Sequence, residues 1–328
     1  MKNINDKMIV GKFTLKNRLV LPPMASATSG EQDTVTDKMI NYYSEMSKDI
    51  GLTIVEHSYI SPEGKAHQGQ LSISKEDDVE GLSKLANAIQ KNGAKAIIQL
   101  SHAGSVTSES VTGYKSLGAS KLADDKLTPD IVMTTKDIAN VVNGFRLAAK
   151  RAMMAGFDGV ELHSAHKYLL NQFYSPITNK RSDEYGGAIE NRIRLHLEII
   201  KSVREEIGKD KLILLRLGAL DYMENGSLIE DAVCAAIAFE KAGVDILDVS
   251  GGLCGYMVKS KAHLQGYFSV ETKEMKKHIS IPVISTGGIT NSDAAEKLIN
   301  SDCADLIGIG RVMKKDPMWA SKVLNKTH

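Results

Sequence analysis

Short apolar runs alternate with longer amphipathic stretches along this chain, and the alternation can be followed eight times. Each apolar run is too short for a helix and predicts a buried strand. The predicted strands are Leu19–Leu21, Leu52–Val55, Ala96–Leu100, Gly159–Leu162, Leu212–Leu217, Ile246–Val249, Val283–Ser285 and Leu306–Ile309. Because each is followed by a helical pattern, the strands are expected to run parallel in one sheet.

The intervening stretches carry apolar residues at helical spacing. They predict helices at Asp37–Lys48, Val79–Asn92, Lys136–Ala155, Ile189–Ile207, Leu228–Ala242, Val270–His278, Asp293–Asn300 and, for a short one, near Pro317–Leu324. Four of these helices stop at a glycine that is placed as a C-terminal cap requires: Gly93, Gly156, Gly208 and Gly243.

Eight strand and helix units predict a single (β/α)8 barrel domain over residues 1–328. A doubly wound open sheet also alternates strands and helices, but it predicts a glycine-rich fingerprint after an early strand. The segment from Val20 to Gly30 has none. The polar segment Ser101–Lys136 is expected to be a long loop insertion after the third strand, with a hairpin of its own, placed to cover the barrel mouth.

Composition and charge narrow the function classes. With 328 residues, 42% hydrophobic and 25% charged, the chain has the profile of a soluble globular protein. Its net charge of +1 gives no field to attract nucleic acid or an anionic membrane. The apolar run Ala232–Phe239 is too short to span a bilayer, and Met1–Arg18 has no signal-peptide core. Three widely spaced cysteines, Cys234, Cys254 and Cys303, favour a reducing cytoplasmic setting.

Two histidines and a tyrosine follow the fourth strand: His163, His166 and Tyr168. Two imidazoles can hold a substrate oxygen by hydrogen bonds, while a phenol, with a pKa near 10, can donate a proton beside it. Taken alone, the histidines are also compatible with ordinary polar residues at a strand end. A metal site is a further alternative, but no carboxylate or cysteine stands at close ligand spacing, and no metal is predicted.

A longer motif surrounds these residues. It reads His163-x-x-His166-x-Tyr168-Leu169-Leu170-x-Gln172-Phe173-x-Ser175-Pro176, followed by Asn179-x-Arg181-x-Asp183-x-Tyr185-Gly186-Gly187. This motif closely resembles that of the old yellow enzyme family of flavin-dependent ene-reductases, in its short form without an iron–sulfur segment. The resemblance implies an FMN-binding barrel that takes hydride from NADH or NADPH and reduces an activated C=C bond in a small-molecule substrate. That substrate is an enone, enal, nitroalkene or larger conjugated molecule. Whether the protein forms a homo-oligomer is left open by the sequence.

In this resemblance, His163 and His166 bind the substrate oxygen and Tyr168 supplies the proton. The segment Pro22-Pro23-Met24-Ala25 resembles the family segment along one edge of the flavin, although Ala25 stands where threonine or cysteine is common. His57 replaces a residue that is usually small. It is expected either to contact flavin or substrate, or to turn away as an ordinary loop histidine.

Two polar residues at strand ends resemble the family's contacts to the flavin's pyrimidine edge. The amide of Gln99 can donate to and accept from that edge, and Arg216 would stabilise the negative charge of the reduced flavin. The alternative for Arg216 is an ion pair with a core carboxylate. Ser105 stands where the family commonly has arginine.

Glycines after the last two strands predict a phosphate site. Gly287 and Gly288 follow the seventh strand, and Gly310 and Arg311 follow the eighth, which is the usual phosphate position in barrels. Such a site fits FMN. It also fits the rival function from another class, a (β/α)8 isomerase or binding protein that takes a phosphate ligand without flavin.

Overall fold

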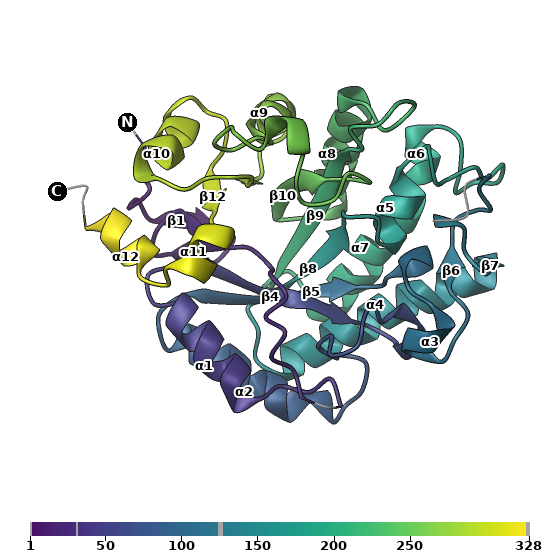
Figure 1. The fold of residues 1–328 in the computed structure, drawn as a ribbon, viewed down its shortest axis with the longest axis horizontal. Helices are drawn as coiled ribbons and strands as arrows, with labels where there is room; N and C mark the ends of the chain where they lie inside the picture. Colours follow the sequence, from purple (N-terminus) through teal and green to yellow (C-terminus); the bar gives the residue numbers. More distant parts are fainter. Residues whose placement is uncertain (1, 31, 124–126, 326–328) are drawn as a thin grey trace.

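A closed barrel of eight parallel strands forms the centre of the computed structural model, which describes residues 2–30, 32–123 and 127–325 (Figure 1). The barrel strands are β3 (Leu19–Leu21), β4 (Leu52–Tyr59), β5 (Lys95–Ser101), β8 (Gly159–Ser164), β9 (Leu212–Leu220), β10 (Ile246–Gly251), β11 (Val283–Ser285) and β12 (Leu306–Gly308). They pair in chain order, and β12 closes the ring by pairing with β3. The predicted barrel is confirmed.

Helices surround the barrel and cover the outer faces of its strands (Figure 1). They are α1 (Asp37–Met46), α2 (Asp78–Gln90), α4 (Thr135–Met154), α7 (Arg194–Ile207), α8 (Ile229–Ala242), α9 (Ser269–Lys276), α10 (Ser292–Asn300) and α12 (Trp319–Leu324). Helix α4 begins at a capping box formed by Thr134 and Asp137, which satisfies two backbone donors at the helix start. The glycines after α2, α4, α7 and α8 have positive φ, as predicted for caps.

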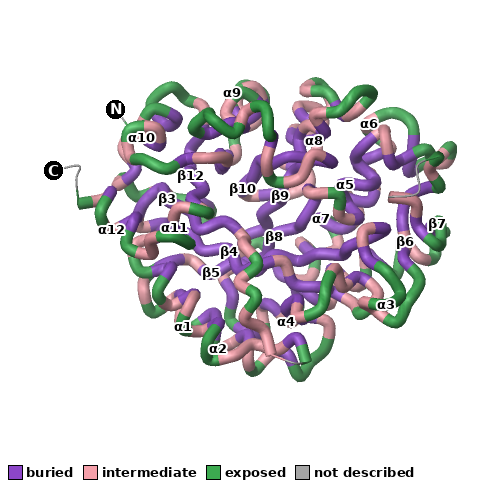
Figure 2. The backbone as a smooth tube through the Cα atoms, in the orientation of Figure 1, coloured by how far each residue is buried: buried purple, intermediate pink, exposed green. Residues whose placement is uncertain are grey.

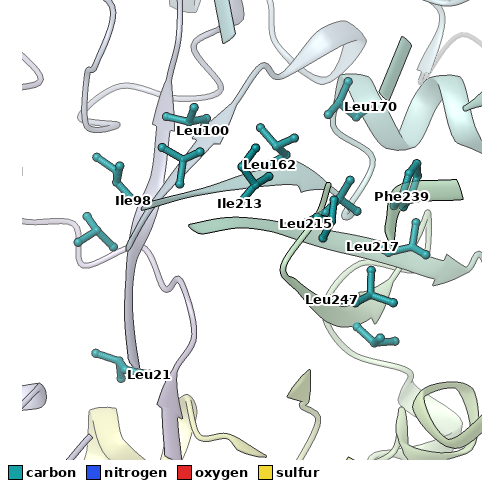
Figure 3. Packing of buried hydrophobic residues seen from close by; sticks show 14 of the residues in the cluster. Leu21, Ile98, Leu100, Leu162, Leu170, Ile213, Leu215, Leu217, Phe239 and Leu247 are labelled. Carbon is teal, nitrogen blue, oxygen red and sulfur yellow. The ribbon is translucent and has the colours of Figure 1, made fainter. Parts of the chain in front are cut away.

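The buried apolar residues separate into two layers. One lies between strands and helices and includes Ile98, Leu162 and Leu215, with Phe239 of α8 drawn close to Leu217 of β9 (Figure 3). The other lies inside the barrel and includes Leu52, Ile97 and Leu214. Figure 2 shows the strands as an almost continuous buried centre inside an exposed outer surface. Strands buried on both faces explain why the sequence shows short apolar runs rather than strict alternation.

An unpredicted antiparallel hairpin, β1 (Met8–Val10) and β2 (Phe13–Leu15), closes the amino-terminal end of the barrel. Its side chains Val10, Phe13 and Leu15 are buried in the same cluster as the interior residues of the strands. That end is therefore filled with apolar side chains. Polar chemistry is left to the carboxyl ends of the strands, where barrels place their active sites.

Outside the insertion after β5, the short helices α5 (Leu169–Tyr174) and α11 (Arg311–Lys315) were not predicted. A third short helix, α6 (Ile189–Arg192), is the first part of a predicted helix. The single helix expected over 189–207 is interrupted at Ile193, which separates α6 from α7.

The insertion after the third strand contains η2 (Gly104–Val106), α3 (Glu109–Thr112), β6 (Leu117–Gly118) and β7 (Ile131–Val132). The predicted hairpin is wrong, because β6 and β7 pair in parallel and parallel strands cannot be joined by a tight turn. Arg181 holds the pair together by donating from Nη1 to the carbonyl oxygens of Ala119 (3.0 Å) and Met133 (2.8 Å). The downstream half of the motif therefore positions this loop.

Candidate active site

The backbone turns sharply after β8, and the turn positions two of the predicted catalytic residues. His166 and Lys167 have φ values of +59° and +72°, a conformation that is rare for residues other than glycine. The side chain of Asn171 accepts from the Lys167 N–H (2.9 Å), and Gln172 donates to the Lys167 carbonyl (2.6 Å). These hydrogen bonds stabilise a costly backbone conformation, which directs His166 and Tyr168 to the same place.

The rings of His163, His166 and Tyr168 form one cluster at the barrel mouth. The His163 ring centroid lies 5.1 Å from that of His166 and 4.8 Å from that of Tyr168. Burial lowers the pKa of both histidines well below the usual value, and the nearby Arg216 lowers both further. Burial also raises the pKa of Tyr168 to about 12. The cluster therefore presents two neutral imidazoles and a protonated phenol.

Hydrogen bonds within the structure determine which nitrogens are available to a ligand. Nε2 of His166 lies 2.7 Å from the hydroxyl oxygen of Ser250 on β10, so Nδ1 is the nitrogen left for a ligand. A neutral His166 that donates from Nδ1 accepts the Ser250 proton at Nε2. Nδ1 of His163 is buried without a partner, and Nε2 has no partner among the described residues, so Nε2 is the nitrogen open to a ligand. Sequence reasoning missed Ser250, which follows an apolar strand without any distinctive motif.

His57 lies beside this cluster. Its ring centroid is 5.5 Å from that of Tyr168 and 6.3 Å from that of His163. Of the two predictions for His57, the structure therefore agrees with the one in which the side chain turns into the site and not with the one in which it turns away.

Two buried carboxyl groups, missed from sequence, lie beneath the mouth. Gln99 donates from Nε2 to Glu161 (2.7 Å), and Nε of Arg216 lies 3.4 Å from Asp248. Burial raises the pKa of Glu161 and of Asp248. The signal was present in the sequence, because each acid interrupts a short apolar run. Arg216 thus forms the core ion pair that was its alternative interpretation, while its Nη atoms have no hydrogen-bond partner among the described residues.

Closure of the barrel brings the segment after β3 against the loop after β12. A Cβ atom added to Gly310 would lie 3.0 Å from the sulfur of Met24 and 3.4 Å from Cγ of Pro22. Ser26 directly follows the segment Pro22–Ala25 and donates its N–H to the buried carboxylate of Glu56 on β4 (2.8 Å). Pro23 is half-buried and Ala25 is exposed, so this segment lines the rim of the mouth.

The predicted phosphate loops carry free backbone donors. Gly287 and Gly288 have φ values of +105° and +72°, and the N–H groups of these two residues and of Gly310 donate to no described residue. A Cβ on Gly287 would lie 2.7 Å from the Tyr267 ring, so only glycine fits there. Arg311 is exposed and donates to the Tyr267 hydroxyl (3.3 Å). Backbone N–H groups without an acceptor, together with the guanidinium of Arg311, fit a phosphate group.

These groups stand on opposite sides of the mouth. In the closed strand order β8 lies opposite β12, so the histidine and tyrosine cluster faces the phosphate loops across the barrel. Gln99 and Arg216 stand on β5 and β9, the two neighbours of β8. This arrangement fits an elongated ligand with a phosphate at one end, and the residues present therefore fit FMN.

No group of three or more histidine, cysteine, aspartate or glutamate side chains among the described residues is arranged to hold a metal ion. None of the described helices is both long enough and apolar enough to cross a membrane.

A profile of the NADH:flavin oxidoreductase / NADH oxidase family matches residues 7–328. The NADH oxidase of Thermoanaerobacter brockii is 37% identical over 98% of this chain, which spans 50% of that protein. The NADPH dehydrogenases of Clostridium acetobutylicum and Halalkalibacterium halodurans are 35% and 36% identical. This chain spans 93% and 90% of their lengths. The chain is thus about half as long as one relative and close in length to two others.

Solved structures agree with this match. 2-Naphthoyl-CoA reductase, in complex with 2-naphthoyl-CoA, superposes with a TM-score of 0.92 at 27% identity; the match covers 99% of this chain and 52% of that one. An old yellow enzyme homologue from Zymomonas mobilis superposes with a TM-score of 0.86 at 26% identity, covering 100% and 94% of the two chains. With its barrel and its predicted motif in place, the chain belongs to the NADH:flavin oxidoreductase / NADH oxidase family, that of the old yellow enzymes, whose cofactors are FMN and NADH or NADPH.

Proposed function

We propose that this protein is an FMN-dependent oxidoreductase that takes hydride from NADH or NADPH and reduces an activated C=C bond, with residues 1–328 acting as one FMN-binding domain. FMN, when bound, would supply the hydride chemistry that links the nicotinamide to the alkene. The observation that carries the proposal is the cluster of His163, His166 and Tyr168, which offers two neutral N–H donors and one protonated hydroxyl within a few ångströms.

The two histidines suit an oxygen that gains negative charge during the reaction. Nε2 of His163 and Nδ1 of His166 have no hydrogen-bond acceptor among the described residues, so both are free to donate to a carbonyl or nitro oxygen. Their donation strengthens as that oxygen becomes an enolate or nitronate, and preorganised donors in a buried site stabilise such charge more than water does.

Tyr168 suits proton delivery to the carbon next to the activating group. Its hydroxyl has no described partner, and a pKa of about 12 keeps the proton on the oxygen at neutral pH. Because the rings of Tyr168 and His163 are 4.8 Å apart, a substrate whose oxygen is held by His163 lies within reach of the Tyr168 hydroxyl. The names of the relatives fit this proposal, since two are NADPH dehydrogenases and one is a reductase of an aromatic thioester.

Anaerobic reoxidation of the photoreduced enzyme tests the proposal. Enones, enals, nitroalkenes and large conjugated pigments are mixed separately with the reduced enzyme, and the return of the oxidised flavin bands at about 370 and 450 nm is followed. Rapid reoxidation by one of these classes supports the proposed activity. A colourless protein that binds no added FMN would instead favour the rival, a barrel that binds a phosphate ligand without flavin.

A further inference from the structure

His57 occupies an irregular part of its strand. The pairing of β4 with β5 shifts register between Val55 and Ser58, so the backbone bulges where His57 stands. A bulge changes the direction of a side chain relative to a regular strand. Here it places the imidazole beside the rings of Tyr168 and His163, with centroids 5.5 and 6.3 Å away, and beside the exposed His67, 5.4 Å away.

Gln70 holds this imidazole in a defined tautomer. Its Nε2 lies 2.7 Å from Nδ1 of His57, the shortest of its contacts, and its second proton is shared between the His57 carbonyl and the Ser101 hydroxyl, each at 3.2 Å. The other end of the amide is identified independently, because Oε1 accepts from the N–H of Ala66 (2.6 Å). Nδ1 of His57 is thus an acceptor, and the proton of the neutral ring is on Nε2.

The ring is neutral and its remaining nitrogen is free. Burial, with a further contribution from His67, lowers the pKa of His57 to about 4. The His57 side chain is half-buried, and Nε2 has no hydrogen-bond partner among the described residues. A proton relay through this ring is disfavoured, because a relay needs both nitrogens and Nδ1 is taken by Gln70.

We propose that His57 is a third hydrogen-bond donor of the substrate site, held by Gln70, and that it selects alkenes with a second acceptor oxygen besides the one bound by His163 and His166. The inference rests on the proposed function and adds a substrate class to it. A fixed donor without a partner is left unsatisfied by a substrate with one oxygen and is satisfied by a substrate with two. Sites built in this way discriminate against the analogue that lacks the acceptor.

Two alkenes separate the effect of His57 from general damage. Maleimide carries two conjugated carbonyl groups and 2-cyclohexenone carries one. The ratio of kcat/KM for maleimide to that for 2-cyclohexenone should fall about three- to tenfold in His57→Leu, the size expected for one net hydrogen bond. His57→Gln keeps an N–H donor and should restore most of the ratio. Gln70→Met removes the contact that holds the tautomer and should lower the ratio less than His57→Leu does.

Nitrogen-15 NMR of the histidine rings provides a readout that does not depend on turnover. The His57 signal, assigned from its loss in His57→Gln, should show the proton on Nε2 in the wild type and a mixture of tautomers in Gln70→Met. A proton on Nδ1 in the wild type, or an unchanged ratio in an active His57→Leu enzyme with full FMN content, would overturn the inference. A wild-type holoenzyme that reduces neither alkene would overturn the proposed function itself.

Discussion

Replacing Tyr168 with phenylalanine removes a single hydroxyl group and leaves the ring in place. The hydroxyl makes no hydrogen bond to any described residue, so its loss leaves no protein group without a partner. The ring contacts with His163 and His57 are kept. We therefore expect the free energy of unfolding to stay within about 0.5 kcal/mol of the wild type, as for a substitution without a structural mechanism.

The effect on catalysis should be much larger. Burial sets the pKa of Tyr168 at about 12, which makes the phenol a far stronger acid than the water that would replace it, whose pKa is about 15.7. Loss of a positioned general acid typically costs about 10²- to 10⁴-fold, or roughly 2.7 to 5.5 kcal/mol of barrier. This cost should appear only in alkene reduction, because hydride transfer from the nicotinamide to the flavin needs no proton from Tyr168.

Stopped-flow measurement of the two half-reactions tests this separation. Flavin reduction by NADH or NADPH should stay within about threefold of the wild type, while reoxidation by an enone slows by the factor above. Tyr114→Phe is a matched control, because Tyr114 lies in the insertion between α3 and β6, is 53% exposed and makes no ring contact with any described residue. Enone reduction at wild-type speed in Tyr168→Phe would mean that the proton comes from water or another residue, and the assignment of Tyr168 would be wrong.

Three further outcomes are expected. Arg311→Ala should weaken FMN retention by roughly 1.5 to 3 kcal/mol in equilibrium dialysis, while Lys314→Ala, exposed on the same helix α11, should not; equal retention in both would remove Arg311 from the phosphate site. Arg216→Met should lower the two-electron potential of bound FMN in a dye-equilibration titration, and an unchanged potential would confine Arg216 to its ion pair with Asp248. Burial lowers the pKa of His196 to about 3 in the folded protein. As the pH falls below about 6.5, His196 is therefore protonated in the unfolded state but not in the folded state. This difference should lower the free energy of unfolding by about 2 kcal/mol between pH 7 and pH 5. In urea unfolding, the decrease in the free energy of unfolding between pH 7 and pH 5 should be about 2 kcal/mol smaller in His196→Gln than in the wild type, and unchanged in His278→Gln. An equal decrease in both variants would contradict the reasoning.

Much of the architecture could be predicted because its signals are local. A strand buried on both faces needs a short apolar run, and a helix that covers a barrel needs an apolar stripe at its own spacing, so all eight strands were found from pattern alone. The glycine caps at Gly93 and Gly243 were predictable for the same reason, since a positive φ is required by the neighbouring residues of the chain itself. The turn after β8 was located by its motif, although its strained backbone was not foreseen.

What the tertiary structure decided depends on residues that are distant in sequence. Whether Arg216 faces a core acid depended on Asp248 from the next strand, and the free nitrogen of His166 depended on Ser250 from the same strand. The tautomer of His57 depends on Gln70, which no periodicity connects to it. The sequence by itself determined the barrel and the types of chemical group at its mouth, because burial and backbone conformation act over a few residues. Which atom of each group is left free was decided only by the fold, because a hydrogen bond needs a partner within about 3 Å and chain closure brings that partner from elsewhere.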